Sequence, residues 1–502
     1  MRQRSLRFSV ILSLLVLCIL VVTAAPAFAK KPKKRKAAAE KAERLKRESE
    51  ARIAALYQVA IARTNQIASP SLPVIGAMND SGASIVAPVT PATNAQFLAD
   101  DAAPPNVNPA AGSLIISEFR LRGPNGASDE FIEIYNDSGA DHTVTAISGT
   151  GYGVAASDGV LRCTIPNGTV IPARGHFLCV NSVGYSYSAY PSGNGTTATG
   201  DATYVTDIPD NAGIALFNNN SGGAFFQLSN RFDAVGSTAE PNTLYREGAG
   251  LPVLTAFSTD YAWVRDECGK GGSTAAGGGP CTISTPKDTD NNASDFFYVD
   301  TNGTPAGAGQ NLGAPGPQNL SAPIQRNSTI TVNFLDNTVA QASAPNRVRD
   351  FTSSPGTNST FGTISIRRRW VNNTGASITR LRFRIIDLDT FPATAVGRAD
   401  LRALTSGAVV VTAINDAVTC AATGTPTTTP CTVTVQGTTL ELDNTAPNSG
   451  QPNGGGFNSS LSAGTITLGT PLANGASINL QFLLGLQATG SFRIYVNVEA
   501  LP

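Results

Sequence analysis

The sequence predicts an all-β protein with two β-sandwiches in tandem, preceded by a signal peptide, a basic helix and a flexible linker. Its 502 residues include 49 Gly and 31 Pro, and only 14% are charged. This composition suits many short strands joined by turns. Residues 112–319 and 320–502 each contain apolar runs separated by turn residues, and each stretch is long enough to bury its own core. We call these stretches the first sandwich and the second sandwich.

Residues 1–29 are predicted to be a secretory signal peptide. Three arginines precede an apolar run from Phe8 to Val22, and the sequence AFA at 27–29 supplies a cleavage site. The alternative is an uncleaved anchor, since the run is only slightly short for a bilayer span. No other segment reaches that length. We therefore expect a secreted, extracellular or envelope location, with no transmembrane domain beyond this segment.

Residues 30–68 form a basic segment predicted to be helical, and residues 69–111 form a Pro/Ala/Ser-rich linker. In the basic segment, Glu40 and Arg44 are one of several acid–base pairs at the four-residue spacing that favours a helix. The formal net charge of the chain is zero, but this arm is strongly basic and the first sandwich is acidic. The arm is interpreted as a solvated spacer, or alternatively as a contact with anionic lipid or cell-wall polymer.

Seven cysteines are present, and Cys18 lies within the predicted signal peptide. The other six fall in three close pairs: Cys163 with Cys179, Cys268 with Cys281, and Cys420 with Cys431. Other connectivities are open, but short loops close at the lowest entropic cost, so local pairing is predicted. These spacings do not suit zinc. Three disulfides would agree with an oxidising location outside the cell.

In the first sandwich, strands are expected near 114–116, 131–135, 175–180 and 214–218. SLIISEF, DEFIEIYN, IPNGTVIPARGHFLCV, NAGIALFN with RFDAVG, and YAWVRDE with KDTDNNASDFFYVD and LGAPGPQN occur in this order. Together they resemble the lamin-tail domain of bacterial secreted proteins. The resemblance implies an immunoglobulin-like sandwich that acts as a protein-interaction or nucleic-acid-interaction module, often joined to hydrolases. The insertions 186–206 and 269–281 depart from the family pattern, and so do this region's cysteine pairs.

The second sandwich is predicted from eight strand-like runs, at 329–336, 362–371, 380–389, 408–414, 431–442, 464–470, 477–486 and 491–500. Turn residues separate these runs, as in an all-β sandwich. The pattern resembles a generic immunoglobulin-like or fibronectin-like module. A Gly- and Pro-rich boundary at 311–322 separates the two sandwiches.

No catalytic or cofactor-binding residue is predicted. The only histidines, His142 and His176, are expected to be exposed, so a histidine-based triad is not indicated. Glu118 and Glu133 could form an acid pair for glycoside cleavage. Glutamates at the same places in the lamin-tail pattern imply instead a framework role, in which the carboxylates accept hydrogen bonds from backbone N–H groups.

A calcium site is considered at Asp288, Asp290, Asn292 and Asp295, because oxygen ligands are concentrated there. The segment lacks the glycine and the final glutamate of an EF-hand loop. A solvated Asx turn is the preferred interpretation, and calcium is kept as the alternative.

Anion binding is considered at Arg367, Arg369, Arg380, Arg382 and Arg384. Arg380, Arg382 and Arg384 alternate with apolar residues, which places them on one face of a strand. If the segments 362–371 and 380–389 pair as a hairpin, a cationic sheet face results. The preferred interpretation is an outward face that is only solvated and is balanced by Asp387, Asp389 and Asp400, and anion binding is kept as the alternative.

These observations favour a secreted or envelope-associated, non-enzymatic binding or structural protein. Its expected partner is a protein or an anionic polymer at the cell surface. Nucleic acid is a further alternative, although sparse aromatic residues near the arginines argue against single-stranded binding. The alternative function is an exported hydrolase, or a hydrolase accessory protein, acting on glycans or phosphoesters. A self-associating surface-layer or adhesion component is the third hypothesis.

Overall fold

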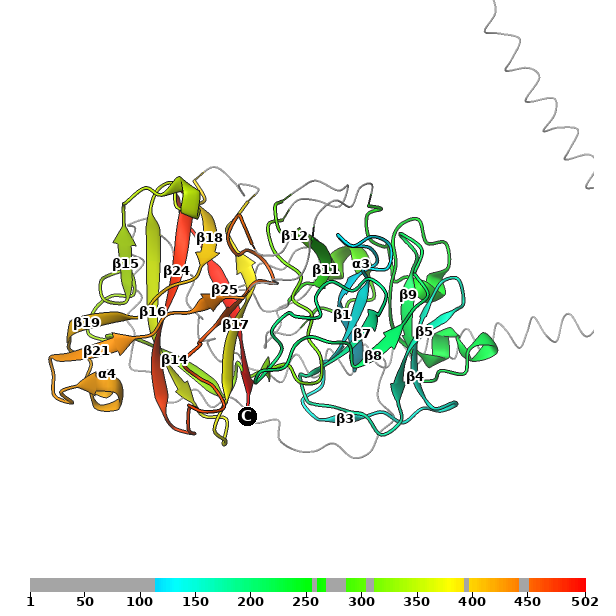
Figure 1. Cartoon of the computed structure of the whole chain (residues 1–502), viewed down its shortest axis with the longest axis horizontal. Helices are drawn as coiled ribbons and strands as arrows, with labels where there is room; N and C mark the ends of the chain where they lie inside the picture. Colours follow the sequence, from blue (N-terminus) through cyan, green and yellow to red (C-terminus); the bar gives the residue numbers. More distant parts are fainter. Residues whose placement is uncertain (1–112, 255–259, 268–285, 304–310, 392–396, 442–450) are drawn as a thin grey trace, which may run out of the picture. The chain divides into compact units, whose positions relative to one another are not determined.

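The computed structural model describes residues 113–254, 260–267, 286–303, 311–391, 397–441 and 451–502 (Figure 1). The predicted signal peptide, basic helix and linker, and the pair Cys268 and Cys281, lie outside these residues. Within them, nearly every regular element is a β-strand, as predicted. No helix of the described segments has both the length and the apolar character needed to cross a membrane. Both sandwiches belong to one compact unit of the chain.

The first sandwich contains two sheets. The larger has the order β12 (Phe296–Asp300), β11 (Tyr261–Arg265), β1 (Leu114–Arg120), β2 (Phe131–Asn136), β7 (His176–Asn181) and β8 (Ala202–Tyr204). The smaller has the order β10 (Arg231–Val235), β9 (Ile214–Phe217), β4 (Gly151–Ala156) and β5 (Leu161–Pro166). A separate pair is formed by β3 (His142–Thr143) and β6 (Val170–Ile171). Apart from the parallel pair of β7 and β8, all these neighbours are antiparallel.

The six-stranded sheet is covered on both faces. Ile116 and Ile132 contribute to a core shared with Val154 and Leu216 of the smaller sheet. Phe131, the neighbour of Ile132, belongs to a second apolar cluster that also includes tyrosines of the insertion 186–206. Successive residues of a strand face opposite sides of a sheet, so both clusters draw on the same strands. This explains why every residue of β1, β2 and β7 is buried.

The second sandwich also contains two sheets around one core. One has the order β13 (Ile324–Gln325), β25 (Ile494–Leu501), β17 (Arg380–Leu388), β23 (Ser460–Ser462) and β22 (Thr439–Leu440). The other has the order β14 (Ile330–Phe334), β16 (Thr363–Asn372), β24 (Ser477–Ala488) and β18 (Asp400–Leu404), with β15 (Arg347–Asp350) also beside β16. The core includes Trp370, Phe383 and Phe482, and the Phe383 ring lies 4.7 and 4.9 Å from the other two.

Two predictions about the second sandwich are wrong. The segments 362–371 and 380–389 do not pair as a hairpin, because β16 pairs with β14, β15 and β24, whereas β17 pairs with β23 and β25. The chain crosses from one sheet to the other between them, as sandwiches often require. Residues 464–470 form a turn with one isolated bridge between Thr467 and Thr470 rather than a strand.

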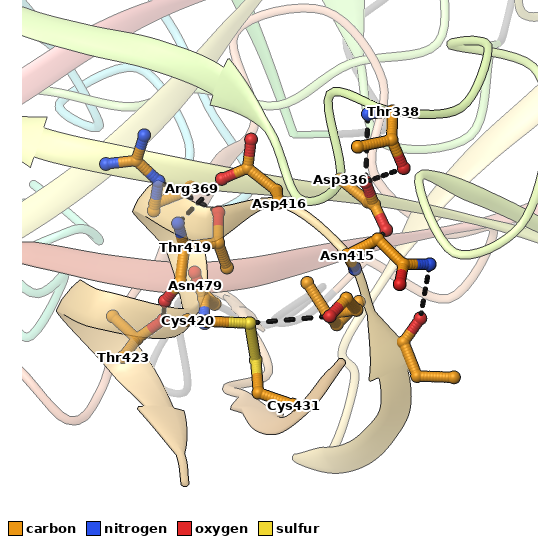
Figure 2. Close-up of a disulfide and its surroundings, with 12 residues drawn as sticks. Asp336, Thr338, Arg369, Asn415, Asp416, Thr419, Cys420, Thr423, Cys431 and Asn479 are labelled. Atoms are coloured by element: carbon orange, nitrogen blue, oxygen red, sulfur yellow. Dashed lines mark hydrogen bonds between the residues drawn. A yellow bond between two sulfur atoms is a disulfide. The ribbon is translucent and has the colours of Figure 1, made fainter. Parts of the chain in front are cut away.

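A small disulfide subdomain, residues 409–435, extends from the second sandwich. It contains β19 (Val409–Ile414), α4 (Ala417–Thr423), β20 (Gly424–Thr425) and β21 (Cys431–Val435). Asp416 caps α4 by accepting a hydrogen bond from Thr419 N at 2.6 Å. The predicted disulfide between Cys420 and Cys431 is formed and is buried in the subdomain's own core (Figure 2).

The remaining short helical elements are η1 (Gly223–Phe225), η2 (Leu228–Asn230), η3 (Thr243–Tyr245), α3 (Asn292–Asp295) and η4 (Pro355–Thr357). The predicted disulfide between Cys163 and Cys179 is also formed, and it joins β5 of the smaller sheet to β7 of the larger.

The boundary segment is a buried connector rather than an exposed linker. Residues 312–319 are all buried. Gly313 N donates a hydrogen bond to Asp300 O of the first sandwich, and Ala314 N donates one to Phe457 O of the second. At Gly316, a side chain would collide with the guanidinium group of Arg384. Glycine is therefore needed here to let the connector approach both sandwiches.

Candidate functional site

A surface hollow of about 260 Å³ lies beside β15 of the second sandwich. It is lined by Ala342, Arg347, Arg349, Phe351 and Ile364. Arg347 and Arg349 are two residues apart on one strand, so the period of two places them on the same side. Phe351 is 79% exposed, and the Arg349 guanidinium carbon lies 4.6 Å from the centre of its ring. The hollow thus combines positive charge with an exposed aromatic face.

Sequence reasoning missed this hollow. The alternation in Arg347-Val348-Arg349 was the available signal, but the run is short and occurs after a Pro-containing turn. The apolar lining of the hollow comes partly from the neighbouring strand β16, where Ile364 lies opposite Arg349 of β15. That pairing cannot be deduced from the run itself.

Glu118 and Glu133 lie opposite each other on β1 and β2, and each is 3% exposed. Glu118 accepts hydrogen bonds from Gly316 N and Asn458 Nδ2, both at 2.9 Å. Glu133 accepts from Gln318 N and from Ser117 Oγ, both at 2.6 Å. Each carboxylate oxygen therefore has a donor, and two of the donors are backbone N–H groups of the connector. This is the kind of bonding expected of framework carboxylates.

We call the buried contact between the two sandwiches, around Glu118, Glu133 and Arg384, the junction. The pKa values of its acids are set mainly by burial. Burial raises the pKa of Glu118, and burial together with Glu118 raises the pKa of Glu133 to about 8. Burial alone would also raise the pKa of Glu499, but Arg382 and Arg384 outweigh it and hold that pKa at about 2. Glu499 is thus the stable anion, whereas burial favours a proton on the pair formed by Glu118 and Glu133 near neutral pH.

Both histidines are buried, which contradicts the expectation of exposure. His142 and His176 are each 8% exposed. His142 packs with its ring near Tyr152, and its Nε2 lies 3.2 Å from the Tyr152 hydroxyl. Burial lowers the pKa of His176 to about 3, so its ring is neutral at pH 7 although Glu133 Oε1 lies 3.7 Å away. His142 is covered within the first sandwich by Tyr152 and Phe232, whereas His176 lies close to Glu499 of the second sandwich.

Arg382 and Arg384 do not form an outward cationic face. They are 0% and 7% exposed, and each donates from Nε to Glu499, at 2.6 and 2.8 Å. Arg384 also donates to Asn458 Oδ1 at 2.8 Å. Buried carboxylates of both sandwiches, Glu499 and Glu118, lie near these arginines. The two arginines therefore neutralise buried negative charge between the sandwiches. Asp387, Asp389 and Asp400, which were expected to balance them, pair instead with Arg493, Arg398 and Arg402 respectively.

The other three arginine candidates lie on two different sheets, Arg380 on β17 and Arg367 and Arg369 on β16. Arg380 pairs with Glu441. Arg369 is buried against α4 and donates to Thr419 Oγ1 at 3.1 Å, as Figure 2 shows. Arg367 is half-buried and donates to Gln481 Oε1 at 3.3 Å. The five predicted residues are therefore not brought together into one site.

The four calcium candidates do not converge on one point with free ligand atoms. Asp295 accepts hydrogen bonds from Thr289 N and Thr289 Oγ1, at 2.9 and 2.6 Å. The amide of Asn292 is fully engaged with the backbone around it, since it donates to Ala234 O and accepts from Gly236 N and Glu247 N. Asp288 alone joins a cluster with a geometry suited to a metal ion.

That cluster consists of Asp233, Glu247 and Asp288, and we call it the acidic cluster. One carboxylate oxygen of each residue lies within 4.8 Å of the others. Burial and Asp233 raise the pKa of Glu247 to about 9 and that of Asp288 to about 6. Sequence reasoning missed Asp233 and Glu247, since each is a single acid in its own segment and only the fold brings them to Asp288.

No family model matches the chain, and no curated protein matches it. Among solved structures, the chain is similar to a DUF4876 family protein from Bacteroides thetaiotaomicron VPI-5482. The two share 17% sequence identity over 37% of this chain and 70% of that one, with a TM-score of 0.26. A likeness this small carries no argument about fold or function.

Proposed function

We propose that this chain is an exported, non-enzymatic binding protein of the cell surface, whose ligand is an anionic polymer. In this proposal the first sandwich is an immunoglobulin-like, lamin-tail-like interaction module, the second is a further immunoglobulin-like module, and the connector joins them into one rigid scaffold. The hollow beside β15 is the proposed ligand site on that scaffold.

The observation that carries the proposal is the composition of the hollow. An exposed aromatic ring offers a platform for the apolar face of a sugar, and arginine binds carboxylate or phosphate through a planar fork. Phe351 supplies the ring, and Arg347 and Arg349 place positive charge beside it. Backbone carbonyls of Asp350, Phe361 and Thr363 accept hydrogen bonds from the Arg349 guanidinium group and hold it there. Large exposed aromatic side chains beside a concave, charged surface are a feature of interaction sites.

The junction supports a non-enzymatic role. Glycoside cleavage needs two carboxyl groups that reach the substrate and water. Glu118 and Glu133 instead have their oxygens hydrogen-bonded within a buried network that joins the two sandwiches. The disulfides Cys163–Cys179 and Cys420–Cys431 support export, because such bonds persist in oxidising compartments.

The test is retention of the purified full chain on immobilised polymers: an acidic cell-wall glycan, a neutral glycan and double-stranded DNA. We expect retention on the acidic glycan at 0.1 M salt and its loss at high salt. Phe351→Ala should weaken retention, whereas Leu468→Ala should not, since Leu468 is a similarly exposed apolar residue outside the hollow. Equal retention of both variants, or binding to none of the polymers, would contradict the proposal.

The hydrolase alternative is tested with the same protein. Incubation with glycoside and phosphoester substrates should give no turnover above that of a Glu118→Gln, Glu133→Gln double variant. Turnover that disappears in this variant would support the hydrolase alternative instead.

A further inference from the structure

We propose that Asp233, Glu247 and Asp288 form a binding site for a hard divalent cation, with calcium as the favoured ion. The site is independent of the proposed function. Asp233 comes from β10, Glu247 from the loop after η3, and Asp288 from the loop before α3. A calcium ion binds oxygen at about 2.3–2.6 Å, so two oxygens on one ion lie at most about 5 Å apart. The spacing of these three carboxylates, within 4.8 Å, meets that limit.

A second observation points to a missing ligand. Glu247 has a side chain that is 4% exposed, and its Oε1 accepts a hydrogen bond from Arg231 Nη2 at 2.8 Å. Its Oε2 is buried and has no hydrogen-bond partner among the described residues. A buried polar atom without a partner is unfavourable by about 1–3 kcal/mol, which coordination to a cation would remove.

Carboxyl groups outnumber positive groups around the acidic cluster. Arg265 already pairs with two of the three ligands and with Asp295: its Nη2 is 2.5 Å from Asp233, and its Nη1 is 3.3 Å from Asp288 and 3.7 Å from Asp295. Arg231 pairs with the third ligand, Glu247. Four carboxyl groups, those of Asp233, Glu247, Asp288 and Asp295, thus lie beside two guanidinium groups.

The backbone that carries the ligands is held in place by Asn292. Its Oδ1 accepts from Glu247 N and Gly236 N, both at 3.0 Å, and its Nδ2 donates to Ala234 O at 2.8 Å. Asp233 is fixed by Ile116 N, which donates to its Oδ2 at 2.6 Å. Asn292, considered above as a ligand, is therefore a positioning residue, because it ties the loop of Glu247 to the strand of Asp233.

The chemistry of the donors selects the class of ion. All three ligands are carboxylates, without sulfur or imidazole, which suits calcium, magnesium or manganese rather than zinc or copper. Calcium accepts irregular shells completed by water, whereas magnesium demands a near-ideal octahedron. Asp288, whose side chain is 22% exposed, provides the route from solvent and room for such waters.

The test is calorimetric titration of the chelator-treated full chain with calcium chloride, and separately with magnesium chloride, at neutral pH. We expect one calcium ion per chain, weaker magnesium binding and a higher melting temperature in calcium. Asp288→Asn should weaken calcium binding about tenfold or more, by analogy with losses at other metal sites. Asp290→Asn, a change in the same loop outside the ligand set, should bind as the wild type does.

Glu247→Gln should weaken calcium binding as Asp288→Asn does, and its fold is checked by circular dichroism. If this buried variant does not fold, the more exposed Asp288→Asn still decides the question. The proposal is overturned if calcium gives no binding heat and no change in melting temperature. It is also overturned if Asp288→Asn binds calcium as tightly as the wild type.

Discussion

At the scale of single residues, Glu133 shows how burial changes the chemistry of an ordinary side chain. Burial and Glu118 raise its pKa from 4.5 to about 8, so the folded state keeps a proton that the unfolded state releases between these values. Its contribution to stability is therefore complete below pH 4.5 and is lost as the pH rises to about 8. The contribution of His176 to stability changes with pH in the opposite direction: it increases as the pH rises from about 3 to 6.5, because burial lowers the pKa of His176 in the folded state to about 3.

The first prediction concerns Glu133→Gln, which cannot ionise and can keep both hydrogen bonds. Between pH 6.5 and 8, where His176 is neutral in the folded state and loses its remaining charge in the unfolded state, the wild type loses stability relative to the variant because Glu133 must ionise in a buried site. The free energy of unfolding of the variant minus that of the wild type should rise by up to about 2 kcal/mol across this window. Urea unfolding at a series of pH values measures it.

Asp210→Asn is the matched control for this measurement. It also removes one carboxylate, but Asp210 and its partner Arg122 are partly exposed, at 37% and 32%. Its unfolding curve should keep the pH dependence of the wild type. A constant difference between Glu133→Gln and the wild type from pH 6.5 to 8 would show that Glu133 is already ionised there.

At the scale of elements, the disulfide subdomain has a small apolar core that includes Leu335 of the sandwich, and hydrogen bonds such as that from Asn415 N to Asp336 Oδ2 tie it to the sandwich. Asn479 of β24 donates to Thr423 Oγ1 at 2.7 Å, and Arg369 of β16 donates to Thr419 Oγ1 (Figure 2). The subdomain core is much smaller than the main core of the second sandwich. The bond between Cys420 and Cys431, which closes a short loop, therefore carries a large share of its stability.

The second prediction is that a Cys420→Ala, Cys431→Ala variant opens locally. Removing a disulfide across 11 residues should lower the free energy of opening the subdomain by about 3 kcal/mol. Amide hydrogen exchange of β21 should accelerate, whereas that of β1 and β2 should not change. In a Cys163→Ala, Cys179→Ala variant, β21 should exchange as in the wild type. Faster exchange throughout both sandwiches would contradict an independent subdomain.

At the scale of the whole molecule, the buried junction couples the two sandwiches. Arg384 contacts Glu499 and Asn458 of its own sandwich, and Asn458 in turn donates to Glu118 of the first. Rings add to this polar network, since Phe297 and Phe457 pack edge to face at 5.4 Å. Because unfolding of either sandwich would expose the junction, the two should unfold together.

The third prediction is that Arg384→Ala separates their unfolding. Removing one partner of a buried ion pair leaves carboxylates uncompensated and costs about 3–5 kcal/mol. Calorimetry should show one main transition for the wild type and two for the variant. Arg398→Ala, which breaks the pair with Asp389 at a partly exposed arginine, should keep a single transition. A single, merely shifted transition for Arg384→Ala would contradict coupling through this residue.

Local patterns were enough to predict most strands, because alternation depends on the strand itself. Strands β1, β2, β7, β9, β16, β17, β24 and β25 all overlap predicted runs. What depends on a distant neighbour was not predictable. His176 was expected to be exposed and Arg382 to face outward, because nothing near them in sequence shows that the other sandwich covers them. Asp233 was missed for the same reason, since its cluster draws on three separate segments.

The buried connector limits how this protein can be divided. Its Gly- and Pro-rich composition invites cleavage or truncation near residue 319, as at an ordinary interdomain linker. Such a fragment would remove Phe457 and Asn458, which would uncover the Phe297 ring that packs on Phe457 and take away a hydrogen-bond donor to Glu118. Newly exposed apolar surface of this kind promotes aggregation. Limited proteolysis should therefore spare the connector, and the two sandwiches are best produced and studied as a single piece.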